Sequence, residues 1–216
     1  MDTTRRHTNR TGRLAILIAA LVIILVAVIV VMALQGAHKS AADPGTATGT
    51  DIASSPAALG TGYVVRPFSA SDLNGHVVDN TFFAKQRLTM VNIWGTFCGP
   101  CIREMPDLAQ LPGEFPATEF AILGVVVDTS YEATDANKAT NATARQLTSS
   151  TGVTYTNVIP DRSIETELLA DVSVVPTTFF VDRAGTVVGA VLEGSKSKAE
   201  WTSIIQGTLA SLPAGS

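Results

Sequence analysis

The chain has 216 residues, of which 46% are apolar and only two are cysteines, and its formal net charge at pH 7 is −4. The first 13 residues carry four Arg and one Asp, a charge of +3, so the rest of the chain carries −7. This acidic balance argues against nucleic acid or an anionic lipid surface as a binding partner.

Residues 14–34 form an apolar run without a charged side chain. About 21 residues at a helical rise of ~1.5 Å span about 31 Å, close to the ~30 Å hydrocarbon core of a bilayer. The run therefore predicts one transmembrane helix that anchors the chain in a lipid bilayer. A cleaved signal peptide is the alternative, but its apolar region would be about 7 to 15 residues long, and no small-x-small cleavage site follows promptly. No cysteine follows the run, which excludes a lipid-modified cysteine.

The charges beside this run predict its orientation. Lys39 is the only lysine or arginine in the stretch that follows, whereas four arginines precede the run, at Arg5, Arg6, Arg10 and Arg13. Because positively charged flanks stay on the cytoplasmic side, residues 1–13 should form a cytoplasmic tail and the remainder should face outward. The predicted location is the cytoplasmic membrane of a bacterium, crossed once.

Residues 35–62 consist mostly of Ala, Gly, Ser, Thr and Pro and have too little apolar surface to order themselves. They predict a flexible linker with a root-mean-square reach of roughly 30 Å. The folded part should then be one domain at residues 63–212, whose length of about 150 residues is enough for a single core.

Strand and helix patterns alternate within this domain. Asn74-Gly75 lies between two short strand patterns and predicts an N-terminal β-hairpin. Strands are expected at 68–73, 76–78, 88–94, 120–127, 156–159, 177–181 and 186–192. Helices are expected at 133–150, 163–170 and 198–212, with a short turn after Asp79 or Asn80. Together these elements predict an α/β fold, a mixed β-sheet with helices on both faces.

The two cysteines, Cys98 and Cys101, lie where the strand at 88–94 turns into a helix. The first turn of a helix directs unsatisfied N–H groups and the positive end of its dipole at Cys98, which favours the reactive thiolate. Cys101 can then close on Cys98 and resolve a mixed disulfide with a substrate. Pro100 suits the first helical position, where its missing N–H has no partner.

Three structural explanations of this pair are weaker than a redox-active dithiol. A structural disulfide closing so short a loop would remove only about 2 kcal/mol of unfolded-state entropy. A zinc site needs four ligands, and His7, His38 and His76 form no second ligand pair, so no metal is expected. Two packing thiols would not account for a strand, C-G-P-C and a helix occurring together. The chemistry of a dithiol needs no cofactor.

Three motifs together resemble a known fold. They are W-G-T-F-C-G-P-C around the cysteines, V-V-P-T-T-F-F-V-D about 75 residues later, and the D-L-N-G-x-x-V opening of the domain. The domain looks like a thioredoxin fold, and it more closely resembles the TlpA/ResA-type thiol-disulfide oxidoreductases of the redoxin (AhpC/TSA-like) superfamily. These proteins are tethered outside the cytoplasmic membrane. The resemblance covers about residues 63–212 and implies an inserted helix and strand between Thr129 and Pro160.

The resemblance implies roles for individual residues. Cys98 corresponds to the nucleophile and Cys101 to the resolving cysteine, the two being joined as a disulfide in the oxidised form. Glu104 corresponds to an acid that tunes proton transfer, and a first-turn Glu that only complements the helix dipole is the alternative. Val175-Pro176 corresponds to a cis X-Pro bond that packs against the dithiol. Substrate contacts are expected from Trp94, Phe97, Gly99, Pro100, Val175, Pro176 and Thr177.

Two residues differ from those usual in related proteins, and one proline agrees with the family. Asn92 stands where cytoplasmic thioredoxins keep a buried Asp, so acid–base duty moves toward Glu104. Phe97 replaces the Trp that usually precedes the first cysteine, which removes a ring N–H. Pro106 corresponds to the proline that kinks the same helix.

These inferences predict a membrane-tethered enzyme outside the cytoplasm that reduces disulfides of exported proteins, for example apocytochrome c. A membrane electron donor linked to thioredoxin would restore its dithiol. Gly-Pro is the thioredoxin dipeptide, and thioredoxin's potential of about −270 mV lies on the reducing side. Two alternatives stay open, a dithiol oxidant of exported proteins and a redox-silent adaptor that binds partners near Pro176. A thiol peroxidase is less favoured, because P-x-x-x-T-x-x-C is absent around Cys98.

Overall fold

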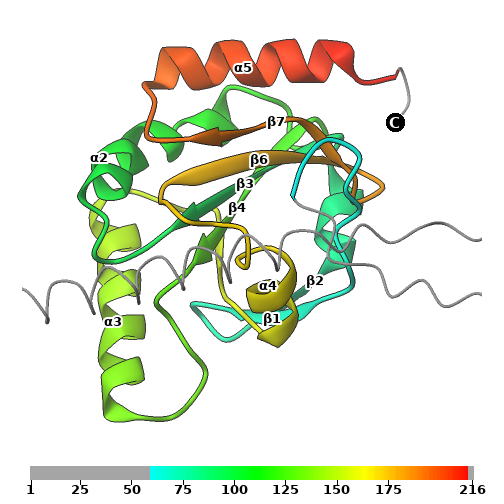
Figure 1. Cartoon of the computed structure of the whole chain (residues 1–216). Coiled ribbons are helices and arrows are strands. Elements are labelled where there is room, and N and C mark those ends of the chain that lie inside the picture. The colour runs from blue at the N-terminus through cyan, green and yellow to red at the C-terminus, as the bar shows by residue number, and fades with distance from the viewer. Residues whose placement is uncertain (1–58, 214–216) are drawn as a thin grey trace, which may run out of the picture. The chain divides into compact units, whose positions relative to one another are not determined.

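The computed structural model describes residues 59–213, which contain a seven-stranded sheet in the order β2-β1-β5-β4-β3-β6-β7 (Figure 1). The strands are β1 Ser69–Asp72, β2 Val77–Asp79, β3 Leu88–Trp94, β4 Phe120–Val126, β5 Thr156–Ile159, β6 Thr177–Asp182 and β7 Val187–Glu193. β4 runs parallel to both β3 and β5, whereas β6 is antiparallel to β3 and β7. The predicted mixed sheet is confirmed.

Helices cover both faces of this sheet. They are α2 Gly99–Leu108, α3 Asp135–Ser150, α4 Arg162–Glu167 and α5 Lys198–Ser211, with 3-10 turns η1 Asn80–Lys85 and η2 Leu111–Gly113. Alternate residues of β3 divide the core: Leu88 and Met90 pack with residues of α2 and α5, whereas Val91 and Ile93 pack with Ile164 of α4. Figure 1 shows α5 (red) along one side of the sheet and α4 (yellow) on the other.

Most elements lie within two residues of their predicted bounds, and α4 is the main exception. This helix ends at Glu167, three residues before the predicted end, and it begins at Arg162 because Asp161 is its N-cap. The Asp161 carboxylate accepts the Ile164 N–H at 2.7 Å and also the hydroxyl of Ser163. Asp79 caps η1 in the same way, by accepting the N–H of Thr81.

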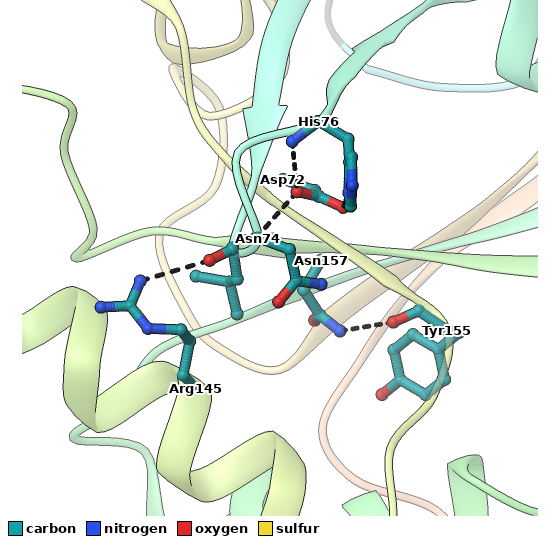
Figure 2. Close-up of polar contacts among 7 residues, drawn as sticks. Asp72, Asn74, His76, Arg145, Tyr155 and Asn157 are labelled. Carbon is teal, nitrogen blue, oxygen red and sulfur yellow. Dashed lines mark hydrogen bonds and ion pairs between the residues drawn. The ribbon is translucent and has the colours of Figure 1, made fainter.

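The predicted β1–β2 hairpin is tied to helix α3. Asp72 Oδ1 accepts the backbone N–H groups of Asn74 and His76, each at 2.8 Å, which closes the hairpin loop (Figure 2). Arg145, on α3, donates from Nη1 to the carbonyl of Leu73 at 3.2 Å. The inserted helix between Thr129 and Pro160 is thus present, and it packs beside the hairpin.

Asn157, on β5, supports the strand that leads to the cysteines. Its Oδ1 accepts the indole N–H of Trp94 at 2.8 Å. Its Nδ2 donates to the carbonyl of Tyr155 at 2.9 Å, as Figure 2 shows. The amide can reach β3 because Gly124, which pairs with Asn157 on the intervening β4, has no side chain. A Cβ at Gly124 would lie 2.0 Å from Asn157 Oδ1.

The predicted tail at 1–13, anchor at 14–34 and most of the linker at 35–62 lie outside the described residues and stay predictions. Between residues 59 and 213, no helix is both long and apolar enough to cross a membrane. The first described residues pack on the β6–β7 hairpin, since Val64 forms a β-bridge with Thr186 and the Val65 N–H donates to Gly185.

Gly124→Ala should destabilise the fold by roughly 1 to 3 kcal/mol, the usual effect of overpacking a core, because the new methyl group would displace the Asn157 amide from Trp94. Gly207→Ala is the matched control on α5, since an added Cβ there meets no atom within 4 Å. It should be neutral or stabilise by up to about 1 kcal/mol. Urea unfolding measures both free energies, and equal midpoints for the two variants would contradict the role given to Gly124.

Candidate active site

Cys98 and Cys101 form a disulfide at the start of α2, with their Cα atoms 5.3 Å apart. Cys98 is the N-cap of the helix, and its Sγ accepts the backbone N–H of Cys101 at 3.2 Å. The sulfur thus lies at the positive end of the helix dipole, which stabilises a thiolate once the pair is reduced. Pro100 is the second residue of α2 rather than the first, but the N–H it lacks is still one of the four that have no intrahelical partner.

The Val175–Pro176 segment meets the disulfide from the far end of the domain. Its peptide bond is cis, as expected. The Val175 carbonyl oxygen lies 3.5 Å from Cys98 Sγ, although the two residues are 77 positions apart. Two hydrogen bonds hold the segment, from the Gly194 N–H to the Pro176 carbonyl at 2.8 Å and from the Thr177 hydroxyl to Val174 at 2.7 Å.

The other residues expected to contact substrates differ in exposure. Phe97 is 70% exposed, and its ring lies over Gly95, where an added Cβ would be 2.7 Å from the ring. Pro100 is exposed and Gly99 half-buried. Trp94 and Thr177 require a correction, because both side chains are buried. Trp94 is fully buried with its indole N–H used by Asn157, and Thr177 is 3% exposed with its hydroxyl bound to the Val174 carbonyl. Trp94 supports β3, and neither side chain offers a surface to a substrate.

An apolar groove of about 510 Å³ opens beside the disulfide. Most of its lining comes from the segment between α4 and β6, the same segment that carries the cis bond. The lining residues are Phe97, Val127, Leu169, Val172, Ser173, Val174 and Val175. Six of these seven side chains are apolar, so the groove suits an apolar stretch of polypeptide lying next to Cys98.

Glu104 lies one helical turn after Cys101 and is only 4% exposed. Its Oε2 accepts the backbone N–H of Lys196 at 3.0 Å, and its Oε1 lies 3.4 Å from the amide nitrogen of Asn92. Burial raises the pKa of Glu104 above its ordinary value of 4.5, and donors from Lys196, Trp201 and Asn92 oppose that rise. A buried, hydrogen-bonded carboxyl of this kind differs from a solvent-exposed glutamate that only complements the helix dipole.

Two residues were not assigned to the site from the sequence, although a capping or turn role was expected for Asp128. Asp128 accepts the backbone N–H of Thr96 at 3.0 Å and also its hydroxyl, which holds the loop just before Cys98. The signal was present, since Thr96 and Asp128 follow neighbouring parallel strands whose carboxyl ends share one edge of the sheet. Lys196 left no such signal, because it contacts Glu104 through its backbone.

A second cavity, of about 480 Å³, lies apart from the cysteines between the β1–β2 hairpin, α3 and the start of β5. Its wall includes Asp72, Arg145, Tyr155 and Asn157 (Figure 2). The Asp72 carboxylate is already used by the hairpin, and the cavity contains no thiol. The described residues 59–213 contain no cluster of His, Cys, Asp or Glu that could hold a metal ion. Thiol chemistry is therefore confined to the groove beside Cys98.

The site combines parallel strands at the centre of the sheet, a C-G-P-C pair at a helix start and a cis-proline that faces it. This combination defines a thioredoxin-like thiol-disulfide oxidoreductase. The profile of the AhpC/TSA family matches residues 61–190, so the chain belongs to the AhpC/TSA family.

Curated relatives point to the same enzyme class. The chain is 27% identical over 149 residues to the thiol-disulfide oxidoreductase ResA of Geobacillus kaustophilus, covering 69% of this chain and 78% of that protein. It is 30% identical over 124 residues to ResA of Bacillus subtilis, covering 57% and 63% respectively. The fold is shared with a putative thiol:disulfide interchange protein DsbE from Chlorobium tepidum, with a TM-score of 0.55 and 22% identity over 69% of this chain and 97% of that one. It is shared too with a secreted Mycobacterium tuberculosis disulfide oxidoreductase, with a TM-score of 0.51 and 20% identity over 67% and 96%.

Glu104→Gln should remove a loss of stability that occurs as pH rises. Because the native pKa is raised, the folded protein binds the proton more tightly than the unfolded chain, so wild-type stability falls from about pH 4.5 up through the native pKa. The neutral variant should gain stability relative to wild type across that window, measured by urea unfolding at a series of pH values.

Glu200→Gln is the control with the opposite sign. Hydrogen bonds from Ser197 lower the pKa of Glu200, so its contribution is present above about 4.5 and is lost as pH falls. Parallel pH dependences for wild type and Glu104→Gln would contradict the buried, proton-binding state of Glu104.

Proposed function

We propose that this protein reduces disulfide bonds of exported proteins on the outer side of the cytoplasmic membrane. The observation that carries the proposal is the position of Cys98 Sγ, which lies at the start of α2, 3.5 Å from the Val175 carbonyl and beside an apolar groove. A substrate segment that reaches this sulfur would lie along the groove. The backbone of Val175 is then available to its main chain.

The reaction is a two-step exchange. The Cys98 thiolate attacks one sulfur of the substrate disulfide, so a Cys98–substrate bond forms and the other substrate sulfur leaves as a thiolate. The Cys101 thiolate then attacks Cys98 Sγ and releases the second substrate sulfur. The substrate gains two electrons, and the enzyme is left with the Cys98–Cys101 disulfide. A membrane thiol donor outside the cytoplasm would have to return those electrons.

Glu104 is proposed to take part in the second step. Cys101 must lose its proton before it attacks, and Glu104 is the buried carboxyl one turn further along α2. In its ionised form it can accept that proton, directly or through solvent, and it then carries the proton as a neutral acid. Its raised pKa supports this role, since a general base works best when its pKa is near the working pH.

The reducing direction is supported by the Gly99-Pro100 dipeptide, which thioredoxin, a reductant of about −270 mV, also has between its cysteines. The outward location and the membrane tether rest on the apolar run at 14–34 and the arginines before it. The substrate class is proposed from the exported setting, with haem-attachment cysteines of apocytochrome c as one example.

Cys101→Ser should trap the first intermediate. Without the resolving thiol, Cys98 can form a mixed disulfide with an oxidised peptide but cannot release it, so an adduct should accumulate and be visible by mass spectrometry. Cys98→Ser is the control and should form far less adduct, because Cys101 is 1% exposed against 5% for Cys98 and lies inside α2, away from the N-cap position. Equal adduct formation by both variants would contradict the assignment of Cys98 as the nucleophile. No adduct with either would favour a redox-silent adaptor.

Phe97→Ala should lower the rate at which the enzyme reduces peptide and protein disulfides. Loss of about 1 to 2 kcal/mol of apolar contact would lower kcat/KM for a peptide disulfide roughly five- to thirtyfold. Hydroxyethyl disulfide, which is too small to occupy the groove, should lose much less. Val77→Ala is the control, because Val77 is 72% exposed on the distant strand β2. An equal loss for both disulfides would show that Phe97 does not contact substrates.

A further inference from the structure

The carboxyl group of Glu104 has room for one more hydrogen-bond donor. Its two clear neighbours are the Lys196 backbone N–H at 3.0 Å and the Asn92 amide at 3.4 Å. The same Asn92 amide nitrogen also donates to the Thr178 hydroxyl, at the shorter distance of 3.1 Å. An ionised carboxylate can accept about four hydrogen bonds. Within residues 59–213, these two donors leave part of the hydrogen-bonding capacity of this buried carboxyl unused.

Trp201, on α5, has the complementary feature. Its side chain is fully buried, and its Nε1 makes no hydrogen bond of normal geometry. Buried indole N–H groups in folded proteins are usually paired. The same N–H nevertheless lies near enough to Glu104 to lower the pKa of that carboxyl. The unpaired indole N–H and the under-bonded carboxyl are thus complementary as donor and acceptor.

Lys196 joins the two side chains. Its backbone N–H binds Glu104, while its Nζ lies 5.0 Å from the centre of the Trp201 ring, a cation–π distance. Carbonyl groups of Glu193 and Gly194 accept from the same Nζ. A capping box between Ser197 and Glu200 then fixes the start of α5 and, with it, the position of Trp201.

We propose that Trp201 is a positioning residue for Glu104, whose indole N–H binds the carboxylate when Glu104 is ionised in the reduced enzyme. This inference rests on the proposed role of Glu104 in deprotonating Cys101. The charged or titratable groups around the carboxyl are Lys196 from the β7–α5 loop, Cys101 from α2, and Tyr155, whose own pKa is raised by burial and by the charge of Glu104. Without the indole donor, Glu104 would stay protonated to higher pH and could not accept the Cys101 proton.

An NMR titration of the full-length, reduced protein tests this contact without altering the core. The protein has two tryptophans, so two indole N–H resonances are expected. The Trp201 resonance should shift with the midpoint at which the Glu104 carboxyl ionises, as followed by infrared difference spectra, and Glu104→Gln should abolish the shift. Trp94 is the internal control, because its indole donates to the neutral amide of Asn157. A Trp201 resonance that ignores the ionisation of Glu104 would overturn the proposal.

Trp201→Phe tests the consequence for the exchange reaction. The rate at which a preformed Cys98–peptide mixed disulfide releases its thiol should shift to higher pH, so that near the wild-type midpoint it falls roughly three- to tenfold. Ile205→Val is the control for core damage, since Ile205 is fully buried on the same helix and in the same core cluster. An unchanged pH profile, or the same change in both variants, would overturn the positioning role. If the wild type released no thiol at any pH, the proposed function would fail, and the NMR titration would still decide the contact itself.

Discussion

The position of one sulfur atom, Cys98 Sγ, is the constraint on which the rest of the site depends. It must lie at the N-terminus of α2, where a backbone N–H and the helix dipole favour the thiolate. It must also face the Val175 carbonyl, which comes from the other end of the domain. Both conditions are met because β3 lies between β4 and β6 and runs antiparallel to β6, so that the helix after β3 and the loop before β6 meet at one edge of the sheet.

Buried polar side chains hold that arrangement in register. Asn157 reaches across Gly124 to the indole of Trp94, and Asn92 binds Thr178 on the neighbouring strand. A one-residue slip of any of these strands would bury a polar group without a partner, and the free-energy penalty for that is large. The network beneath the cysteines thus specifies one alignment of the strands. Glu104 is buried in the same region and accepts a hydrogen bond from the β7–α5 loop. The side chains that align the strands and the proposed acid–base residue therefore lie together.

Much of this could be predicted from the sequence. Apolar runs and the Asn74-Gly75 turn located the strands, and the C-G-P-C pair located the start of α2. Other features depend on pairings between distant segments, which no local pattern encodes. Helix α4 begins one residue earlier and ends three residues earlier than predicted, and the Asp161 cap was not identified from the sequence. Trp94 was assigned to the substrate surface, yet β3 is buried on both of its faces and the Trp94 side chain is fully buried with it. The hydrogen bond from the Lys196 backbone to Glu104 becomes visible only when the β7–α5 loop is placed against α2.

The reduction potential of the Cys98–Cys101 couple tests the proposed reductase most directly. The protein would be equilibrated in dithiothreitol or glutathione buffers, and its thiols would be counted by alkylation. A value well below the glutathione couple, near the about −270 mV of thioredoxin, is expected for a dithiol that gives electrons to exported disulfides. A value above about −180 mV would place the couple with protein disulfide isomerase and stronger oxidants, and it would contradict the reducing direction.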